Sequence, residues 1–336
     1  MLIEKNIQLK PLNTFGINVV AREFASVEST KDLAKILNTN KSNLLVIGGG
    51  SNILLTKDVD ALVLHINIKG IEIVSVCENN VRVRVAAGEN WHEFVSWCLD
   101  KNYGGVENLS LIPGNVGTAP IQNIGAYGVE LKDVFISCEA MNIQTQEICT
   151  FKKDDCNFGY RSSIFKEKLK GQYIIISVIF ELSILHHVIK KNYGDIETEL
   201  KKNRIENPTI QDISKAVISI RNLKLPDPKV LGNSGSFFKN PVISFVQFEL
   251  LKIQFPKIPH YKVSETTVKI PAGWLIETAG FKGKTFKNYG VHNKQALVLV
   301  NYGNASGIDI LKLSKKIQEA ILFIFDIVLE NEVNIL

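Results

Sequence analysis

Cysteine and histidine are scarce in this chain, with five and six copies among 336 residues. The five cysteines form no C-x-x-C pair, and their spacing to the histidines matches no metal site. We therefore expect no bound metal. An odd number of widely scattered cysteines is typical of reduced thiols, which predicts a cytoplasmic protein.

Long apolar runs are also absent. The apolar stretch at residues 173–180, "YIIISVIF", is too short to cross a bilayer and predicts a buried strand. The start of the chain carries Glu4 and lacks the apolar core of a signal peptide. We expect neither a membrane span nor a signal peptide.

Neither sign of charge dominates, since 39 Lys and Arg face 34 Asp and Glu, for a net charge of +5. The densest basic strip, residues 190–204, is interrupted by acidic residues and lacks an aromatic-rich nucleic-acid signature. A solvated surface explains this strip better than a nucleic-acid groove. The small positive balance still favours anionic small ligands.

Helix and strand patterns alternate near the N-terminus. Ser29 can cap a helix whose apolar face consists of Leu33, Ile36 and Leu37. Residues 43–55 predict a strand, a glycine turn and a second strand, and residues 61–66 predict another strand. We interpret this pattern as a small α/β unit that ends near residue 67.

A second unit begins with two strands within residues 71–88, followed by a helix that Asn90 can cap. Two prolines within residues 223–233 disfavour regular structure, so we expect a domain boundary around residues 222–228. Residues 307–326 predict an amphipathic helix with an apolar face formed by Ile310, Leu313, Ile317, Ile321 and Ile324.

Two glycine-rich stretches are candidates for binding a ligand. The first, "IGGGSN" at residues 47–52, can turn backbone N–H groups towards an anion, although a simple hairpin turn also fits it. It lacks the lysine of a Walker A loop and the spacing of a Rossmann fingerprint. The second, residues 113–128, lies in an uncharged segment from Asn108 to Val129. Together they suggest a dinucleotide that stretches between two neighbouring α/β units.

Three further stretches carry candidate reactive groups. Residues 235–241, "GSFFKNP", are either a loop packed by its aromatic residues or a dry wall beside a reactive serine. Arg161 in "FGYR" could hold a carboxylate by a two-pronged bond, or could lie on the surface and cover Phe158. Glu330 and Glu332 lie at a chain end that should fray unless it is docked.

These motifs stand in one order along the chain: "NTFGI" (13–17), "GGGSN", "AGENWHEFV", "LIPGNVGTAPIQNIGAYGVE", "FGYRSSIFK", "KLPDPKVLGNSGSFFKNP", "AGWLIE" and "VHNKQALVLVN". In that order they resemble the UDP-N-acetylenolpyruvoylglucosamine reductase family, from about residue 8 to residue 333. Residues 111–130 and 224–241 are the most specific blocks. The segment "NYGDIE" (192–197) is similar to the longer form of the family, which has a tyrosine loop over the substrate.

The resemblance implies a mixed α/β and α+β fold of the vanillyl-alcohol-oxidase type. Its expected parts are two FAD-binding subdomains (1–67 and 68–222), an α/β substrate-binding domain (223–328) and a C-terminal tail (329–336) that carries Glu332. The implied reaction is the NADPH-dependent reduction of UDP-N-acetylglucosamine enolpyruvate to UDP-N-acetylmuramate through FAD. This step belongs to peptidoglycan precursor synthesis, and hence to cell wall biogenesis, cell shape, the cell cycle and cell division. A monomer with no nucleic-acid or membrane partner is expected.

Residue roles follow from the same resemblance. Ser236 is the implied proton donor, and Arg161 and Glu332 are expected to stabilise the enolic intermediate at its carboxylate. The residues expected to bind FAD are Gly48, Gly49, Gly50, Ser51, Asn52, Gly114, Gly117, Thr118, Asn123, Gly125 and Tyr127. The residues expected to bind substrate are Tyr160, Tyr193, Arg221, Lys224, Asn240, Tyr261 and Gln295.

The chain also departs from the family pattern. Asn115 replaces a small residue, which could alter the flavin contact, and Asn334 stands where an arginine is common. Only four residues follow Glu332, so we expect a more loosely held glutamate. For the opening motif, we hypothesise that Phe237 and Phe238 keep Ser236 dry and that Lys239 supplies positive charge near it.

Three other functions fit parts of the sequence. An oxidase of small alcohols could share the flavin fold, but it would not need "FGYR", "GSFFKNP" and the late glutamate together. A nucleotide sensor with a decayed site would be yellow and inert. A nucleic-acid binder would show salt-dependent retention on DNA without a flavin spectrum.

Overall fold

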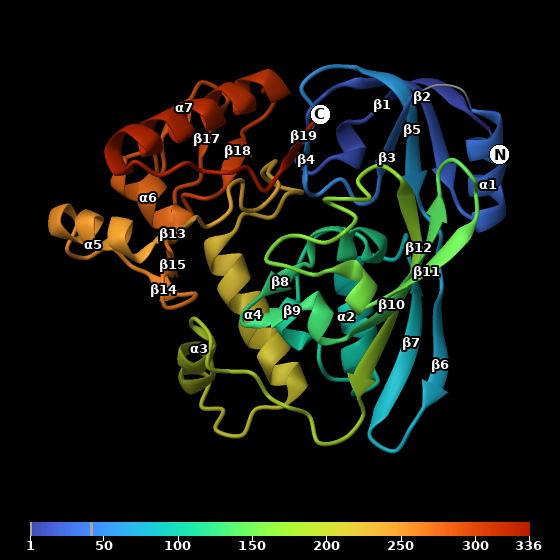
Figure 1. Cartoon of the computed structure of the whole chain (residues 1–336), viewed down its shortest axis with the longest axis horizontal. Helices are drawn as coiled ribbons and strands as arrows, with labels where there is room; N and C mark the ends of the chain where they lie inside the picture. Colours follow the sequence, from blue (N-terminus) through green and yellow to red (C-terminus); the bar gives the residue numbers. More distant parts are fainter. Residues whose placement is uncertain (1, 41–42) are drawn as a thin grey trace. The chain divides into compact units, whose positions relative to one another are not determined.

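The computed structural model describes residues 2–40 and 43–336, which form two compact units (Figure 1). The first unit comprises Met1–Ile7, Ala21–Gly49 and Val59–Leu223, and the second comprises Gln8–Val20, Gly50–Asp58 and Lys224–Leu336. The domains expected from the sequence are contiguous stretches. In the structure, the segments Gln8–Val20 and Gly50–Asp58 belong to the second unit, although they lie near the N-terminus. Among the described residues, no helix is both long enough and apolar enough to cross a bilayer.

The first unit begins with a four-stranded sheet in the order β1-β2-β5-β3. β2 (Val20–Val27) and β3 (Leu44–Ile47) both run parallel to β5 (Val59–Ile66), and β1 (Glu4–Gln8) forms the edge. Parallel strands need a crossover, which α1 (Thr30–Thr39) supplies. The Ser29 hydroxyl accepts the Asp32 N–H (3.1 Å), so the expected cap and its buried face are confirmed.

A five-stranded antiparallel sheet follows in the order β11-β10-β12-β7-β6. Figure 1 shows β6 and β7 as a long hairpin. The strands are β6 (Ile71–Val76), β7 (Asn80–Ala86), β10 (Phe135–Asn142), β11 (Ile148–Lys152) and β12 (Tyr173–Ser183). The predicted buried strand is β12, at the centre of this sheet. Helix α2 (Trp91–Asp100) buries Trp91 and Phe94 against Phe180 of β12.

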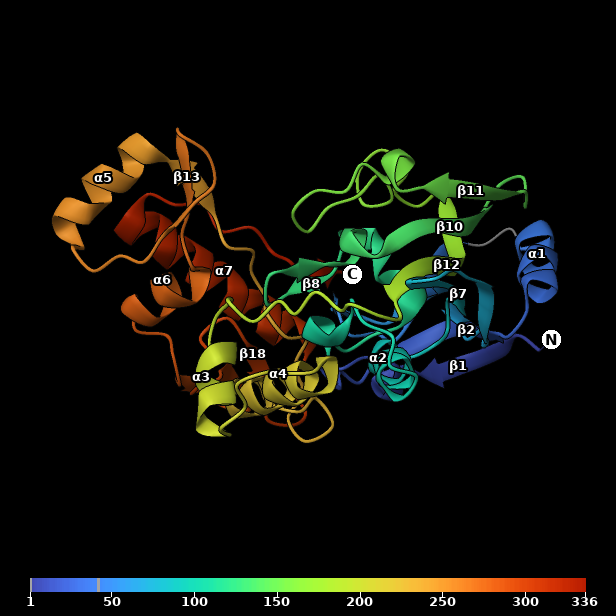
Figure 2. The same cartoon turned by 90° about the horizontal axis from the view of Figure 1, so that it is seen from below.

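Two helices complete the first unit, and Figure 2 shows them next to each other. α3 (Ile196–Lys202) and α4 (Ile210–Lys224) share a small apolar core that includes Ile196, Leu200 and Val217. The basic strip at residues 190–204 is therefore not only a solvated surface, because its two apolar side chains are buried between these helices.

The second unit contains α5 (Phe245–Gln254), α6 (Ala272–Thr278) and α7 (Gly307–Phe325). One small sheet has the order β13-β15-β14, and another has the order β16-β17-β18. Their strands are β13 (Val242–Ser244), β14 (Tyr261–Lys262), β15 (Thr267–Lys269), β16 (Thr285–Phe286), β17 (Tyr289–Val291) and β18 (Leu299–Asn301). The predicted helix at residues 307–326 is confirmed as α7, but Ile324 is exposed because Phe325, four residues after Ile321, takes the buried position.

The end of the chain is docked. β19 (Asn334–Ile335) pairs in parallel with β4 (Ile53–Leu54), which follows the first glycine-rich stretch. The N–H of Leu336 donates to the Leu54 carbonyl oxygen (2.9 Å). A segment that could have frayed is thus held as a strand of the second unit.

Candidate active site

The two glycine-rich stretches meet inside the first unit. A Cβ atom on Gly48 would lie 2.7 Å from Thr118 Cγ2, and one on Gly49 would lie 2.9 Å from Gly114 Cα. A Cβ on Gly117 would collide with Ala87. Glycine therefore leaves room for close packing, against the Thr118 side chain at Gly48 and against backbone atoms at Gly49 and Gly117. This contact confirms that the two stretches lie together, as the dinucleotide hypothesis needs.

Asn115 lies at this contact. Its Oδ1 would be 2.8 Å from a Cβ on Gly49, and its carbonyl oxygen accepts both the N–H (3.1 Å) and the hydroxyl (2.8 Å) of Thr118. The departure at position 115 therefore fills space beside the first glycine-rich stretch, and its side chain packs on Gly49.

The first glycine-rich stretch continues into the second unit at Gly50. Gly50 has φ +61°, and a Cβ there would collide with the Leu12 carbonyl oxygen. Its own carbonyl accepts the Thr14 N–H (3.0 Å). The "NTFGI" motif thus shapes the far end of this stretch.

Gly50→Ala should destabilise the protein more than strain of the left-handed backbone alone would, because the added methyl group also collides with the Leu12 carbonyl oxygen. We expect its unfolding free energy to fall by about 2–5 kcal/mol, from left-handed strain and overpacking together. Gly16→Ala is the matched control, because Gly16 has φ +64° and nothing within 4 Å of the added carbon. Denaturant unfolding should show a loss of only about 1–2 kcal/mol for the control. Equal losses would mean that the Leu12 contact is unimportant.

Arg161 is attached to the second glycine-rich stretch. Its Nη2 donates to the Gly125 carbonyl oxygen (2.7 Å), and its guanidinium lies 5.3 Å from the Tyr160 ring centre. Phe158 packs instead against Phe135, with ring centres 5.0 Å apart. Arg161 is thus bonded to the backbone of the second glycine-rich stretch, and its catalytic role stays a prediction.

Asn123 is fully buried, and its side chain is used inside the protein. Its Nδ2 donates to Gly159 O and to Glu130 Oε2, both at 3.1 Å, and its Oδ1 accepts the Lys132 N–H (3.0 Å). Any contact between Asn123 and FAD would therefore have to come from its backbone.

Asn108 is a functional candidate that sequence reasoning missed. It is 1% exposed, and its Nδ2 donates to the carbonyl oxygens of Tyr127 (3.0 Å) and Lys190 (2.8 Å). A Cβ on Gly128 would lie 3.3 Å from the Cβ of Tyr193, so the tyrosine segment packs beside this turn. No sequence signal distinguishes Asn108 from the other amides of this uncharged segment, Asn115, Gln122 and Asn123.

Arg221 on α4 contributes a half-buried cation to the first unit. Its Nε is buried and has no hydrogen-bond partner within the described part of the chain. Desolvation lowers the pKa of its guanidinium, and the charge of Tyr127 acts in the opposite direction. Burial, and then Arg221, also lower the pKa of His92, whose Nδ1 accepts the Leu111 N–H (3.0 Å). An unpaired Nε–H next to a neutral histidine suits an anionic ligand.

Ser236 and Glu332 lie on adjacent extended segments of the second unit. Ser236 pairs with Val298, and the Phe237 N–H donates to Leu297 O (2.8 Å). On the other side, Phe237 O accepts the Glu332 N–H (2.8 Å). Both proposed catalytic side chains are half-buried. The fold thus brings together two residues that are 96 positions apart in the sequence.

The neighbours of Ser236 are two buried rings and a paired lysine. Phe237 and Phe238 are 0% and 1% exposed, which fits both a loop packed by its aromatic residues and a dry wall beside a reactive serine. Lys239 Nζ lies 2.7 Å from Glu330 Oε2, so the charge of Lys239 is paired with that of Glu330. The roles of all three residues towards Ser236 stay predictions.

The expectation of a loosely held Glu332 is wrong. The Asn52 side-chain amide donates to Glu332 O (3.2 Å). Asn334 in turn donates to Asn52 O through its backbone N–H (3.1 Å) and its Nδ2 (2.9 Å). Asn334, where an arginine was expected, therefore fastens the segment that carries Glu332 to the first glycine-rich stretch.

The residues expected to bind substrate fall on both units. Tyr160 and Tyr193 are 39% and 49% exposed in the first unit, and Tyr261 on β14 is 55% exposed in the second. Two others have structural contacts: Asn240 Oδ1 accepts the Ala272 N–H (2.9 Å), and Gln295 Oε1 accepts the Leu297 N–H (3.3 Å). Lys224, the last residue of α4, is exposed. Their substrate roles stay predictions.

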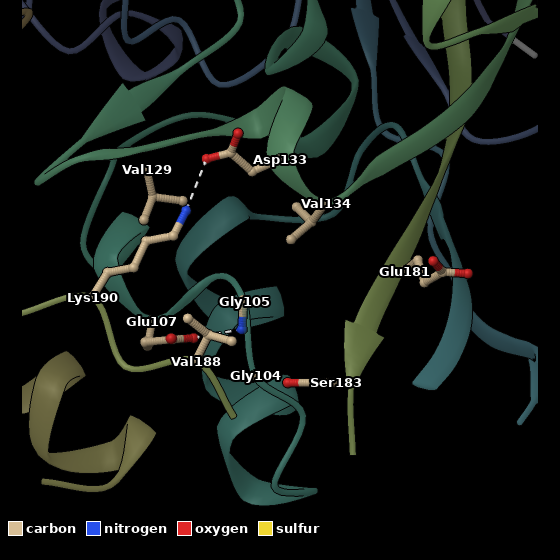
Figure 3. A pocket seen from close by; sticks show the side chains of 10 residues that line it. All are labelled: Gly104, Gly105, Glu107, Val129, Asp133, Val134, Glu181, Ser183, Val188 and Lys190. Atoms are coloured by element: carbon tan, nitrogen blue, oxygen red, sulfur yellow. Dashed lines mark hydrogen bonds and ion pairs between the residues drawn. The ribbon is translucent and has the colours of Figure 1, made fainter. Parts of the chain in front are cut away.

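A cavity of about 190 Å³ in the first unit contains none of these residues (Figure 3). Lys190 reaches across it to Asp133 Oδ2 (3.3 Å). Glu107 in its wall accepts the Gly105 N–H (2.6 Å), and burial raises the pKa of the Glu107 carboxyl. Because these polar groups already have partners, we assign the cavity no ligand.

Comparison with known proteins defines first the class and then the family. Residues 20–151 match a family model described as an FAD binding domain, and residues 227–336 match one described as the C-terminal domain of UDP-N-acetylenolpyruvoylglucosamine reductase. The chain is therefore a flavoprotein of mixed α/β architecture.

Full-length relatives narrow the class to one family. The UDP-N-acetylenolpyruvoylglucosamine reductases of Flavobacterium johnsoniae and Amoebophilus asiaticus are 57% and 48% identical, each over 100% of both chains. The chain belongs to the UDP-N-acetylenolpyruvoylglucosamine reductase family. A crystal structure of the enzyme from Thermus caldophilus, 22% identical with a TM-score of 0.70 over 100% of this chain and 99% of that one, shares the fold.

Proposed function

We propose that the chain reduces the enolpyruvyl group of UDP-N-acetylglucosamine enolpyruvate to give UDP-N-acetylmuramate, using FAD and NADPH, in peptidoglycan precursor synthesis. One observation supports this most: Ser236 and Glu332 lie on adjacent paired segments in a chain of this family. The reaction needs two electrons and a proton, and NADPH carries the electrons as hydride.

The residues present fit FAD. The first glycine-rich stretch has no room for side chains at Gly48 and Gly49, so its backbone groups can approach phosphate closely, and Gly114 beside Gly49 is part of the same proposed site. Gly50, Ser51 and Asn52 continue it. When bound, FAD accepts and donates hydride. FAD contacts by Gly117, Thr118, Gly125 and Tyr127, and by the backbone of Asn123 alone, are part of the same proposal.

Ser236 holds the proton that completes the reduction. A serine hydroxyl is a weak acid, but hydride addition to the enolpyruvyl double bond leaves negative charge on the carbon beside the carboxylate, which is a strong base. The buried rings of Phe237 and Phe238 exclude water from one side of the serine segment. The weak donor is adequate if it is held close to that carbon.

Arg161 and Glu332 act at the substrate carboxylate. Arg161 can bind it by a charge-assisted hydrogen bond, and this stabilises the enolate into which the carboxylate is drawn. The backbone of Glu332 is held because both its N–H and its carbonyl oxygen are bonded, and its carboxyl group can hold a proton at the enolate oxygen.

A diphosphate that joins two sugars needs cations and donors. We propose that Arg221 and Lys224 supply the charge, and that the remaining contacts come from Tyr160, Tyr193, Asn240, Tyr261 and Gln295. The proposal also includes a cytoplasmic monomer without a nucleic-acid or membrane partner, and roles in cell shape, the cell cycle and cell division.

An anaerobic titration tests the function. The purified protein should show a flavin spectrum that NADPH bleaches and that UDP-N-acetylglucosamine enolpyruvate restores. An alcohol oxidase would ignore the enolpyruvyl nucleotide and would be reduced by small alcohols. A yellow protein that NADPH and the nucleotide leave unchanged would indicate a sensor, and either result would contradict the proposal.

A further inference from the structure

Asn123 occupies a buried junction that FAD binding does not explain. It follows the 3-10 helix η4 (Pro120–Gln122), has a left-handed backbone (φ +44°) and is 0% exposed. Its Nδ2 donates in two directions, to Gly159 O and to Glu130 Oε2, each at 3.1 Å. A buried amide with such a set of partners fixes the segments that it joins.

One of those segments is the turn that presents Arg161. Gly159 and Ser162 exchange backbone hydrogen bonds of 3.0 and 3.3 Å, so Tyr160 and Arg161 form the tip of a tight turn. Arg161 itself has φ +54°, an uncommon conformation that surrounding contacts must maintain.

The turn at residues 159–162 is held at two points by one short segment, residues 123–125. Asn123 holds its base through Gly159 O, and Gly125 O holds the Arg161 guanidinium at 2.7 Å. The other partner of Asn123, Glu130, lies on β9 (Val129–Glu130), which pairs with β8 (Gly125–Ala126). Asn123 therefore joins the base of the Arg161 turn to the hairpin that holds the tip.

We propose that Asn123 is a positioning residue for Arg161 and sets where the guanidinium meets the substrate carboxylate. This inference rests on the role of Arg161 in the proposed function. Displacing a catalytic group by about 1 Å can cost on the order of 100-fold in rate. Loss of the bond to Gly159 should therefore slow the step that involves substrate and spare flavin reduction by NADPH.

Asn123→Asp tests the proposal, because aspartate keeps the shape, the Oδ1 acceptor and the tolerance of left-handed backbone but replaces the amide donors with a carboxyl. This carboxyl faces Glu130 Oε2, so repulsion between like charges adds to the loss of the bond to Gly159. We expect reoxidation of the flavin by substrate to slow by about 10- to 100-fold, and reduction by NADPH to change by less than about twofold.

Asn157→Asp is a closely matched control. Asn157 also follows a 3-10 helix, η6 (Asp154–Cys156), and has the same φ of +44°. The Asn157 side chain is exposed and makes no hydrogen bond within the described part of the chain. The same chemical change at this position should leave both half-reactions at the wild-type rate.

A double-mutant cycle with Arg161→Ala separates positioning from general support of the fold. If Asn123 acts through Arg161, Asn123→Asp should change the Arg161→Ala enzyme by less than about twofold. An equal slowing in both backgrounds would overturn the inference, as would a normal Asn123→Asp enzyme. Wild-type reoxidation in Arg161→Ala would instead contradict the proposed function.

If Asn123→Asp does not fold, Asn123→Gly and Asn157→Gly replace the pair. Glycine adopts the left-handed conformation without strain and also removes both donors. The same cycle with Arg161→Ala then decides the question.

Discussion

Ser236→Ala is expected to leave reduction of the flavin by NADPH unchanged and to slow its reoxidation by substrate by roughly 1000-fold. A positioned general acid contributes about 10²- to 10⁴-fold, and alanine removes the hydroxyl, which carries the only proton that the side chain can donate. The backbone pairings of Ser236 with Val298 and of Phe237 with Leu297 do not need the hydroxyl, so the segment should remain in place. Stopped-flow absorbance of the two half-reactions measures both rates.

Ser234→Ala is the matched control two residues earlier. Its hydroxyl lies 3.3 Å from Thr14 Oγ1 and 3.4 Å from Ile53 O, which are long contacts whose loss costs little. This variant should keep both half-reactions close to the wild-type rates. Equal slowing of both half-reactions in Ser236→Ala would contradict the assignment of Ser236 as proton donor.

Glu332→Gln is expected to have the second-largest effect, with the substrate half-reaction slowed roughly 100-fold or more. Glutamine keeps the size of the side chain, and the bonds that hold this segment come from the backbone of Glu332, so its position is preserved. The substitution removes the carboxyl group, which can hold a proton at the enolate oxygen. Single-turnover reoxidation by substrate, followed after reduction by NADPH, measures the change.

Glu330→Gln provides the control on the same segment. Its side chain is 69% exposed and pairs with Lys239, and an exposed ion pair contributes at most about 1 kcal/mol. Glu330→Gln should therefore alter turnover by less than about twofold. If the two variants behaved alike, the effect would come from the charge of the tail and not from Glu332.

Local structure could be predicted where a few neighbouring residues determine it. The cap at Ser29 and the helix at residues 307–326 depend on contacts within four residues, and both are confirmed. Ile324 shows the limit of such patterns. Its spacing fits the buried face, but packing places Phe325 there instead because the surrounding core decides which side chain is covered.

Contacts between distant segments could not be predicted in the same way. Charge alone suggested a role for Lys239 beside Ser236 and did not show its partner Glu330, which lies 91 residues later. The short tail suggested a loose Glu332, but Asn52 and Asn334 hold it. Asn108 escaped notice because no sequence pattern sets it apart from the other amides of its uncharged segment.

By itself, the sequence determined the family, the two glycine-rich stretches and the residue types that can bind a dinucleotide and donate a proton. These properties depend on local backbone freedom and on side-chain chemistry. Only the tertiary structure decided that the two stretches touch, that the segment of Ser236 pairs with the segment of Glu332, and that the Asn123 side chain bonds to the turn that carries Arg161. Such pairings join segments far apart in the chain, and they are set by packing and by hydrogen bonds that the folded chain alone can form.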